Sequence, residues 1–165
     1  MDDLFRSPVG RWQRVSPRLA TVRRWLLAGW AALAVVAGVV VMQLTGRTSS
    51  TWLVVLGLAA IAAVTAAAWW GIGRTVALWG YAEDEEELLI VRGALFRRLV
   101  VVPYGRMQYV DVQAGPLDQL AGIATVHLHT ASPGTTAVIP GLPPEEAARL
   151  RDRLTALGES QAAGL

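Results

Sequence analysis

The chain has 165 residues, a length typical of about one domain, and its hydrophobic fraction of 53% is high for a soluble domain. It contains no cysteine, which excludes disulfide bonds, thiolate metal sites and cysteine nucleophiles and leaves the redox compartment open. The net charge of +2 is too small to indicate nucleic-acid binding by itself. All 15 basic residues are arginine, which reflects either base composition or a preference for phosphate groups.

Two long apolar segments fill much of the first half of the chain. No charged residue lies between Arg24 and Arg47, or between Arg47 and Arg74. Each stretch reaches the roughly 20 residues that a helix needs to cross a bilayer. We therefore predict a transmembrane hairpin at 25–73, with spans at 25–45 and 51–72. Because neither span contains an ionisable residue, the pattern argues against a transporter or an intramembrane enzyme.

The distribution of arginine predicts the orientation of this hairpin. The connecting loop carries only Arg47, whereas the N-terminal segment 1–24 is basic and contains Arg6, Arg11, Arg14, Arg18, Arg23 and Arg24. By the positive-inside rule, both termini are cytoplasmic and the short loop lies outside. Two alternatives are a cleaved signal peptide and a pair of buried helices in a soluble protein. The first segment is too long and starts too late for a signal peptide, and charge-free runs of this length are unusual in soluble helices.

After Arg74 the hydrophobic pattern alternates with a period of two, which is typical of strands. About seven short antiparallel strands are predicted, the clearest at Thr75–Tyr81, Leu88–Gly93, Phe96–Val102, Gln108–Gln113, Ala124–His129 and Thr135–Ile139. The turns between them are an acidic one at Glu83–Glu87, a hairpin signal at Ser132-Pro133-Gly134, and Gly115-Pro116 followed by one helical turn at 117–121.

The C-terminal part of the chain changes period again. Pro143 and Pro144 followed by two glutamates mark a helix start. The apolar face of this helix consists of Ala147, Leu150, Leu154 and Leu157. We expect the helix to end at Gly158 and to cover the apolar face of the sheet. The soluble domain thus spans 74–158, followed by a tail at 159–165.

Several motifs in this order resemble a known family. They are Leu88-x-Ile90-x-x-Gly93, Val102-Pro103-Tyr104-x-Arg106-Met107-Gln108, Gly115-Pro116-Leu117-x-x-Leu120-x-Gly122 and Ile139-x-Gly141-Leu142. From about residue 15 to 158 the chain is similar to the membrane-flanked bacterial pleckstrin-homology-like (PH-like) proteins of the YdbS-like group. The resemblance implies a bacterial inner-membrane protein of α+β class, with a two-helix hairpin and a PH-like split β-barrel capped by a C-terminal α-helix. It supplies no catalytic residues.

Two clusters were considered as metal sites. His127 and His129 share one face of a strand, but no third ligand stands at a suggestive spacing, so a solvated face is expected. The run Glu83–Glu87 is either a solvated hairpin tip or a site for a divalent cation or a basic partner. Its negative charge would repel phosphate, which argues against inositide recognition in this loop. We predict no metal and no cofactor.

The best candidates for contacts with anionic lipid headgroups are Arg74, Arg97, Arg98 and Arg106. An arginine near an anionic leaflet gains roughly 1 kcal/mol. The alternative is that these residues serve only orientation and solubility.

No nucleophile motif, phosphate-binding loop or paired carboxylates indicate an enzyme. We predict a noncatalytic scaffold or protein-binding module, tethered at the cytoplasmic face of the membrane, that binds a protein partner or self-associates. Two alternatives remain open. One is an anionic-lipid sensor, and the other is an accessory subunit of a transporter or an envelope-stress system.

Overall fold

A computed structural model describes residues 12–45, 51–94, 96–130 and 137–163. The chain divides into two compact units. One unit contains residues 20–74, and the other combines residues 1–19 with residues 75–165. Each unit is described by itself below.

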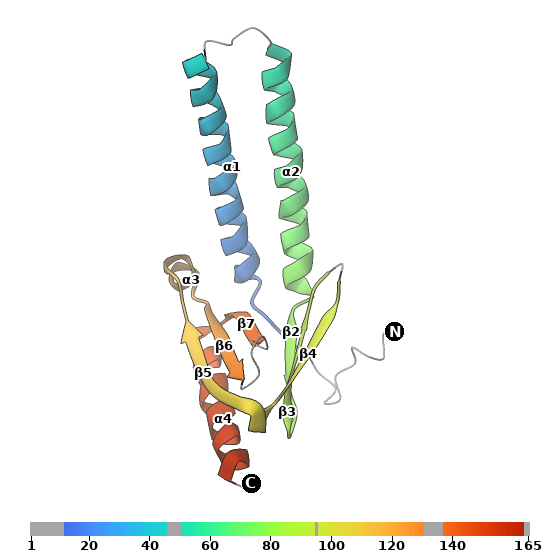
Figure 1. The fold of residues 1–165 in the computed structure, drawn as a ribbon, viewed down its shortest axis with the longest axis vertical. Coiled ribbons are helices and arrows are strands. Elements are labelled where there is room, and N and C mark those ends of the chain that lie inside the picture. Colours follow the sequence, from blue (N-terminus) through green and yellow to red (C-terminus); the bar gives the residue numbers. More distant parts are fainter. Residues whose placement is uncertain (1–11, 46–50, 95, 131–136, 164–165) are drawn as a thin grey trace. The chain divides into compact units, whose positions relative to one another are not determined.

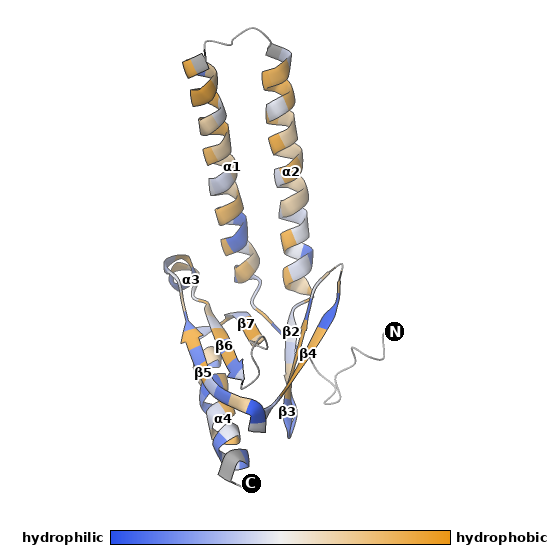
Figure 2. Ribbon diagram, viewed as in Figure 1, coloured by the Kyte–Doolittle hydropathy of each residue, from blue (hydrophilic) through white to orange (hydrophobic). Residues whose placement is uncertain are grey.

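Two long helices form the helical unit (Figure 1), namely α1 (Arg18–Thr45) and α2 (Thr51–Ala77). Both are long and apolar enough to cross a membrane, and hydrophobic colours predominate along their ribbons, with strongly hydrophilic residues mainly near the start of α1 and the end of α2 (Figure 2). Arg24 lies 5.1 Å from the ring centroid of Trp69, and Arg74 lies 4.7 Å from that of Trp70. These cation–π pairs place the arginines beside the aromatic residues expected at a membrane interface. The predicted connecting loop at residues 46–50 lies outside the described residues.

Both helices extend beyond the charge-free segments. The first begins at Arg18, where the amide of Arg18 donates to the side chain of Ser16 at 3.3 Å. The second continues to Ala77, so the prediction of a strand beginning at Thr75 was wrong. Thr75 and Val76 favour strands as isolated residues, but here they continue a helix that is already formed and needs no new nucleation.

Four antiparallel strands form the first sheet of the other unit, in the order β1-β2-β3-β4. They are β1 (Gln13–Arg14), β2 (Gly80–Glu83), β3 (Glu87–Arg92) and β4 (Arg98–Pro103). The first of these was missed by the sequence analysis. It precedes α1 in the chain, yet Gln13 lies opposite Tyr81 and Arg14 opposite Gly80. The residues before the first helix and those after the second are therefore neighbours in one sheet.

Three antiparallel strands form the second sheet, in the order β5-β6-β7. They are β5 (Met107–Gln113), β6 (Ala124–Thr130) and β7 (Ala137–Leu142), with a short 3-10 helix η2 (Tyr104–Arg106) before β5 and α3 (Pro116–Ala121) after it. Asp118 accepts a hydrogen bond from the amide of Gly115 at 3.3 Å, which fixes the start of α3, and Pro116 occupies the first turn, where a missing amide donor costs nothing. The predicted hairpin turn at Ser132-Pro133-Gly134 lies outside the described residues.

The last element, α4 (Pro144–Ala163), packs on β5, β6 and η2. Ala147, Leu150 and Leu154 are fully buried, as their spacing predicted. The helix does not end at Gly158, contrary to the prediction. A glycine costs a helix only about 1 kcal/mol. The turn beyond it gains packing on η2, because the side chain of Gln161 lies against Gly105.

Gly141 in β7 holds the segment before α1 against the domain. Its carbonyl oxygen accepts a hydrogen bond of 2.8 Å from the amide of Ser16. Its φ is +72°, which favours glycine, and a Cβ there would come within 2.8 Å of the Cβ of Leu19. The start of α1 is thus attached to the second sheet as well as to the first.

Candidate functional site

The four predicted headgroup arginines do not form one cluster. Arg97 and Arg98 are exposed at the start of β4, and Arg98 lies opposite Arg92 of β3. Arg106 follows the other end of this strand, and a six-residue strand is about 17 Å long. Arg74 belongs to the helical unit. The domain therefore brings Arg97 and Arg98 together with Arg92, which the sequence analysis did not single out, and separates them from Arg106.

A shallow groove of about 170 Å³ lies beside the β3–β4 turn, lined in part by Trp12, Arg14, Trp79, Val91, Gly93 and Arg97. The Arg92 guanidinium lies 5.9 Å from the ring centroid of Trp79. Gly93 has a φ of +102°, and a Cβ there would collide with the carbonyl group of Phe96. The tight turn that follows leaves Phe96 85% exposed next to the arginines. Basic and aromatic side chains therefore share this surface.

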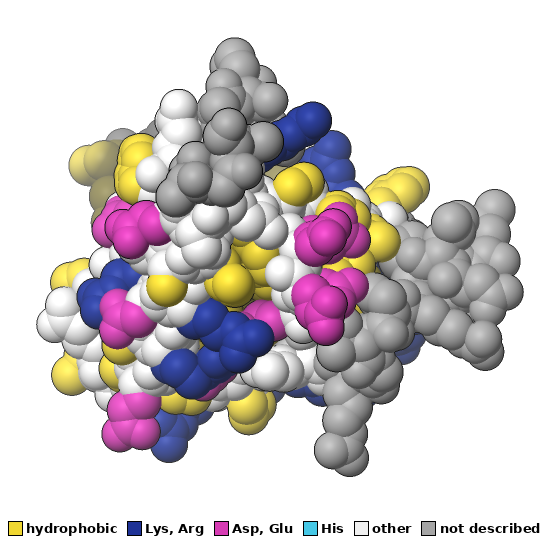
Figure 3. Space-filling model, turned by 90° about the horizontal axis from the view of Figure 1, so that it is seen from below, with side chains coloured by type: hydrophobic (Ala, Val, Ile, Leu, Met, Phe, Trp, Pro, Cys, Tyr) yellow, Lys and Arg dark blue, Asp and Glu magenta, His cyan; other side chains and the backbone are white. Residues whose placement is uncertain are grey.

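The opposite end of the same sheet contains the acidic run. On the face of the molecule drawn in Figure 3, basic and acidic side chains are interspersed. Glu83 does not belong to a solvated tip, because its side chain is only 6% exposed. It lies 2.6 Å from Arg149 and 3.0 Å from Arg153, both on α4. The turn proper consists of the residues between Glu83 and Glu87.

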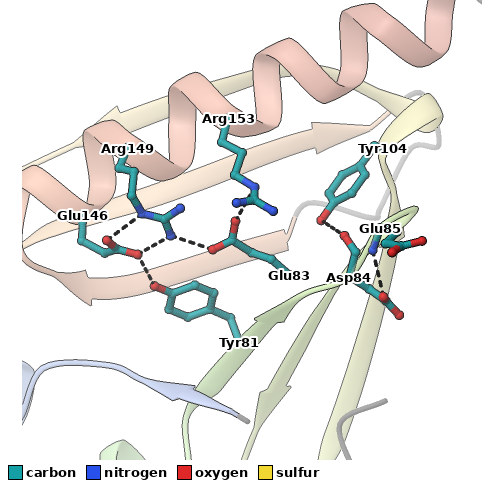
Figure 4. A network of polar contacts seen from close by, with 8 residues as sticks. All are labelled: Tyr81, Glu83, Asp84, Glu85, Tyr104, Glu146, Arg149 and Arg153. Carbon is teal, nitrogen blue, oxygen red and sulfur yellow. Dashed lines mark hydrogen bonds and ion pairs between the residues drawn. The ribbon is translucent and has the colours of Figure 1, made fainter. Parts of the chain in front are cut away.

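Glu83, Tyr81, Glu146, Arg149 and Arg153 form a network that we call the polar clamp (Figure 4). The Tyr81 hydroxyl donates to Glu146 at 2.7 Å. Arg149 donates through Nε to the other oxygen of Glu146 at 2.8 Å and through Nη2 to Glu83 at 2.6 Å. The clamp joins β2 to the first half of α4. Glu83 and Arg149 are 66 residues apart in sequence, so the sequence left open whether the acidic run was a solvated tip or bound a cation or a basic partner.

The clamp shifts the pKa values of Tyr81, Glu146 and Arg149. The hydrogen bond from Arg149 is the main reason that the pKa of Glu146 is lowered, and the same bond raises the pKa of Arg149. Burial, followed by the hydrogen bond to Glu146, raises the pKa of Tyr81. All these groups keep their ordinary charge at neutral pH, so the clamp has the chemistry of a structural joint and not of an acid–base site.

Tyr104 fixes the acidic turn to η2. Its hydroxyl donates to the carbonyl oxygen of Asp84 at 2.9 Å, and its amide donates to that of Glu86 at 3.1 Å. Burial raises the pKa of Tyr104 to about 12, with a smaller contribution from the charge of Glu83. The tyrosine of the proline-tyrosine-x-arginine motif thus has a role in folding.

The two histidines lie on the outer face of the second sheet. His129 lies opposite Tyr109, and their rings stack with centroids 4.2 Å apart. His127 lies opposite Asp111, whose carboxylate accepts a hydrogen bond of 2.7 Å from Gln113. Among the described residues, no three histidine or acidic side chains are grouped so that they could hold a metal ion.

A second groove, which we call the β5–α4 groove, has a volume of about 180 Å³. Residues Met107–Val110 of β5 form one side, and the other side consists of Leu154, Thr155, Gly158 and Glu159 of α4. β5 is an edge strand of its sheet, and no other strand in the described part of the chain pairs with its free side, so this groove lies beside an edge that is open there. The groove was not predicted from the sequence, because Gly158 was expected to end the helix, whereas α4 continues to Ala163.

Comparisons with known proteins agree with this architecture. Residues 26–157 match the family model described as "Bacterial PH domain". The chain belongs to the bacterial PH domain family. It is 41% identical over 80 residues to the "UPF0699 transmembrane protein YdbS" of Bacillus subtilis (strain 168). That match covers 48% of this chain and 49% of the relative, so about half of each protein is aligned. No solved structure matches the chain. The predicted family and fold class are confirmed.

The lowered pKa of Glu146 makes a testable prediction about acid stability. A carboxylate whose pKa is lower in the folded state than in the unfolded state stabilises the fold at neutral pH. This stabilisation begins to be lost when the pH falls below the ordinary pKa of 4.5, and it is gone once the pH has fallen below the folded-state pKa. We expect Glu146→Gln to lower the melting temperature at neutral pH and to flatten its decline in acid. Melting the full chain in mild detergent across a pH series measures both effects.

Glu145→Gln is the matched control, because Glu145 is exposed and lies outside the polar clamp. Its curve should parallel that of the unmodified chain. Parallel curves for Glu146→Gln and the unmodified chain would contradict the role assigned to the clamp.

Proposed function

We propose that this protein is a noncatalytic, membrane-tethered scaffold whose PH-like domain binds a partner protein at the cytoplasmic surface. The observation that carries the proposal is the pairing of β1 with β2, two strands that are separated in sequence by both apolar helices. The domain is therefore built around the two ends of a hairpin that suits a bilayer.

The same pairing supports a hairpin topology. Because β1 and β2 are hydrogen-bonded neighbours, the segments before α1 and after α2 lie on the same side of any membrane that the helices cross. Arginine asymmetry assigns that side to the cytoplasm, since Arg47 is the only basic residue between the two apolar segments.

Tethering explains how a module without catalytic residues can act. Only two residues separate the end of α2 at Ala77 from the start of β2 at Gly80. A short connection keeps the domain near the leaflet, where a flexible tether of similar length gives an effective concentration in the millimolar range. Weak contacts with a partner in the same membrane then suffice for binding.

Single cysteines test the topology, because the chain contains none of its own. In intact cells, we expect an impermeant maleimide to label Ser49→Cys in the connecting loop and to leave Asp118→Cys of α3 unlabelled. Asp118 participates in the start of α3, so Leu120→Cys, at an 85% exposed position, serves as its control. After cell lysis, both α3 variants should react. Labelling of the α3 variants in intact cells would contradict the proposed orientation.

A second candidate function is contact with anionic lipid at the β3–β4 turn. The supporting observation is that Arg92, Arg97 and Arg98 lie beside the exposed Phe96, at the end of the sheet where Gly80 follows α2. Arginines attract anionic headgroups and an exposed aromatic ring suits the interface, so the turn has both components of an interfacial contact.

An environment-sensitive dye on Ala94→Cys tests this contact in the full chain reconstituted into lipid nanodiscs. We expect its emission to shift to the blue in anionic discs relative to zwitterionic discs, and Arg97→Gln with Arg98→Gln to abolish the difference. Arg106→Gln, at the other end of β4, should leave the difference intact. Equal losses for all these changes would indicate a general charge effect and would refute a site at the turn.

A further inference from the structure

The open edge of β5 is less protected than the other sheet edges in the described part of the domain. Edge strands usually avoid unwanted pairing through proline, charge or bulges. β4 ends at Pro103, and β7 contains Pro140, each of which lacks a backbone donor. β5 has no proline, and its single charged residue, Asp111, is hydrogen-bonded to Gln113. Its only irregularity lies at its start, between Met107 and Tyr109.

The β5–α4 groove provides a place for a side chain beside this edge. Val110 is only half-buried, although it alternates with the outward-facing Tyr109 and Asp111. Leu154 is fully buried beneath the groove, and Gly158 has no side chain to fill it. A strand added along β5 would place alternate side chains toward α4, and one apolar side chain could cover the exposed part of Val110 in the space beside Gly158.

The negative charge of Glu159 at the rim of the groove favours some incoming segments over others. Glu159 is exposed and makes no ion pair with any residue in the described ranges. An incoming segment with a basic residue would complement Glu159, and an acidic segment would be repelled. Segments of membrane proteins next to the cytoplasmic ends of their spans are rich in arginine and lysine.

We propose that the β5–α4 groove binds an extended, basic juxtamembrane segment of a partner membrane protein as an added strand next to β5. This inference rests on the proposed function and names the class of partner. Backbone hydrogen bonds along β5 provide binding, one apolar side chain fills the groove at Gly158, and a basic side chain pairs with Glu159. The tether places the domain at the surface where such segments emerge.

Synthetic peptides test the proposal on the full chain in uncharged detergent, with fluorescence anisotropy as the measurement. The first probe is a short serine- and threonine-rich peptide with one central leucine and two arginines. We expect it to bind, and we expect little binding when its arginines are replaced by glutamate. A version with proline on each side of the leucine should bind about ten- to a hundredfold more weakly, because two hydrogen bonds are lost and each loss weakens binding roughly three- to tenfold.

Variants of the protein locate the binding. Glu159→Gln should weaken the arginine peptide about two- to fivefold, the usual contribution of an exposed ion pair. Gly158→Leu should fill the groove and remove most of the binding, and leucine favours a helix more than glycine does. Because a Cβ at Gly158 would lie 3.7 Å from the carbonyl oxygen of Tyr104, an unchanged melting temperature must accompany the loss. Glu145→Gln, an equal change of charge at the other end of α4, is the matched control and should have no effect. Hydrogen exchange should slow at β5 amides when peptide is bound.

Equal affinity for the proline and unmodified peptides, or no effect of Gly158→Leu, would overturn the proposal. Crosslinking from Gln108 to a second copy of this chain alone would also overturn it in favour of self-association. Failure of this groove proposal can be distinguished from failure of the proposed scaffold function. If Gly158→Leu loses the peptide but keeps the partners that copurify with the unmodified chain, the groove is not the docking site and the scaffold stands.

Discussion

The pairing of β1 with β2 is the constraint on which the other features depend. Gln13 and Tyr81 are neighbours although both apolar helices lie between them in the chain. Closing a flexible loop costs conformational entropy, and this cost grows only slowly with the length of the loop. Helices that are already inserted as a hairpin would lower the cost further, because they would bring the two strands close together before the strands pair. A second attachment, from Ser16 to Gly141, reaches the other sheet. The first strand of this PH-like domain precedes the helical hairpin in the chain. The first sheet is therefore complete only when this strand pairs with β2, which follows the hairpin.

The remaining contacts complete a domain that is fixed at one end by these strands. The polar clamp joins β2 to α4 at Tyr81 and Glu83, so the element next to the hairpin also holds the terminal helix. Because these contacts hold α4 on the domain, the second half of the helix lies beside β5 and forms one side of the β5–α4 groove, where Gly158 and Glu159 are found. The basic β3–β4 turn lies at the end of the first sheet where α2 joins it. Membrane attachment, domain stability and the two candidate binding surfaces therefore depend on the same few strands.

Local patterns in the sequence predicted the elements whose character is set by neighbouring residues. The absence of charge marked the helices, alternation marked β5 and β6, and helical spacing marked the buried face of α4. Properties set by distant partners were missed. β1 has only two residues, too few for a period, and the burial of Glu83 depends on arginines far along the chain. Among the candidate site residues, Arg97 and Arg98 are close in sequence and in space, whereas Arg106 lies beyond the far end of β4, a separation that the predicted strand at 96–102 already implied.

A disulfide across the β1–β2 pair tests the central claim most directly. Arg14 and Gly80 lie opposite each other, and the chain has no other cysteine to interfere. The doubly substituted chain, Arg14→Cys with Gly80→Cys, would carry a protease site in the loop between the helices and be oxidised in membranes. After cleavage, the account predicts that the two fragments stay linked on a non-reducing gel, and that Arg14→Cys with Glu85→Cys does not link them. Fragments that separate for both pairs would contradict the account.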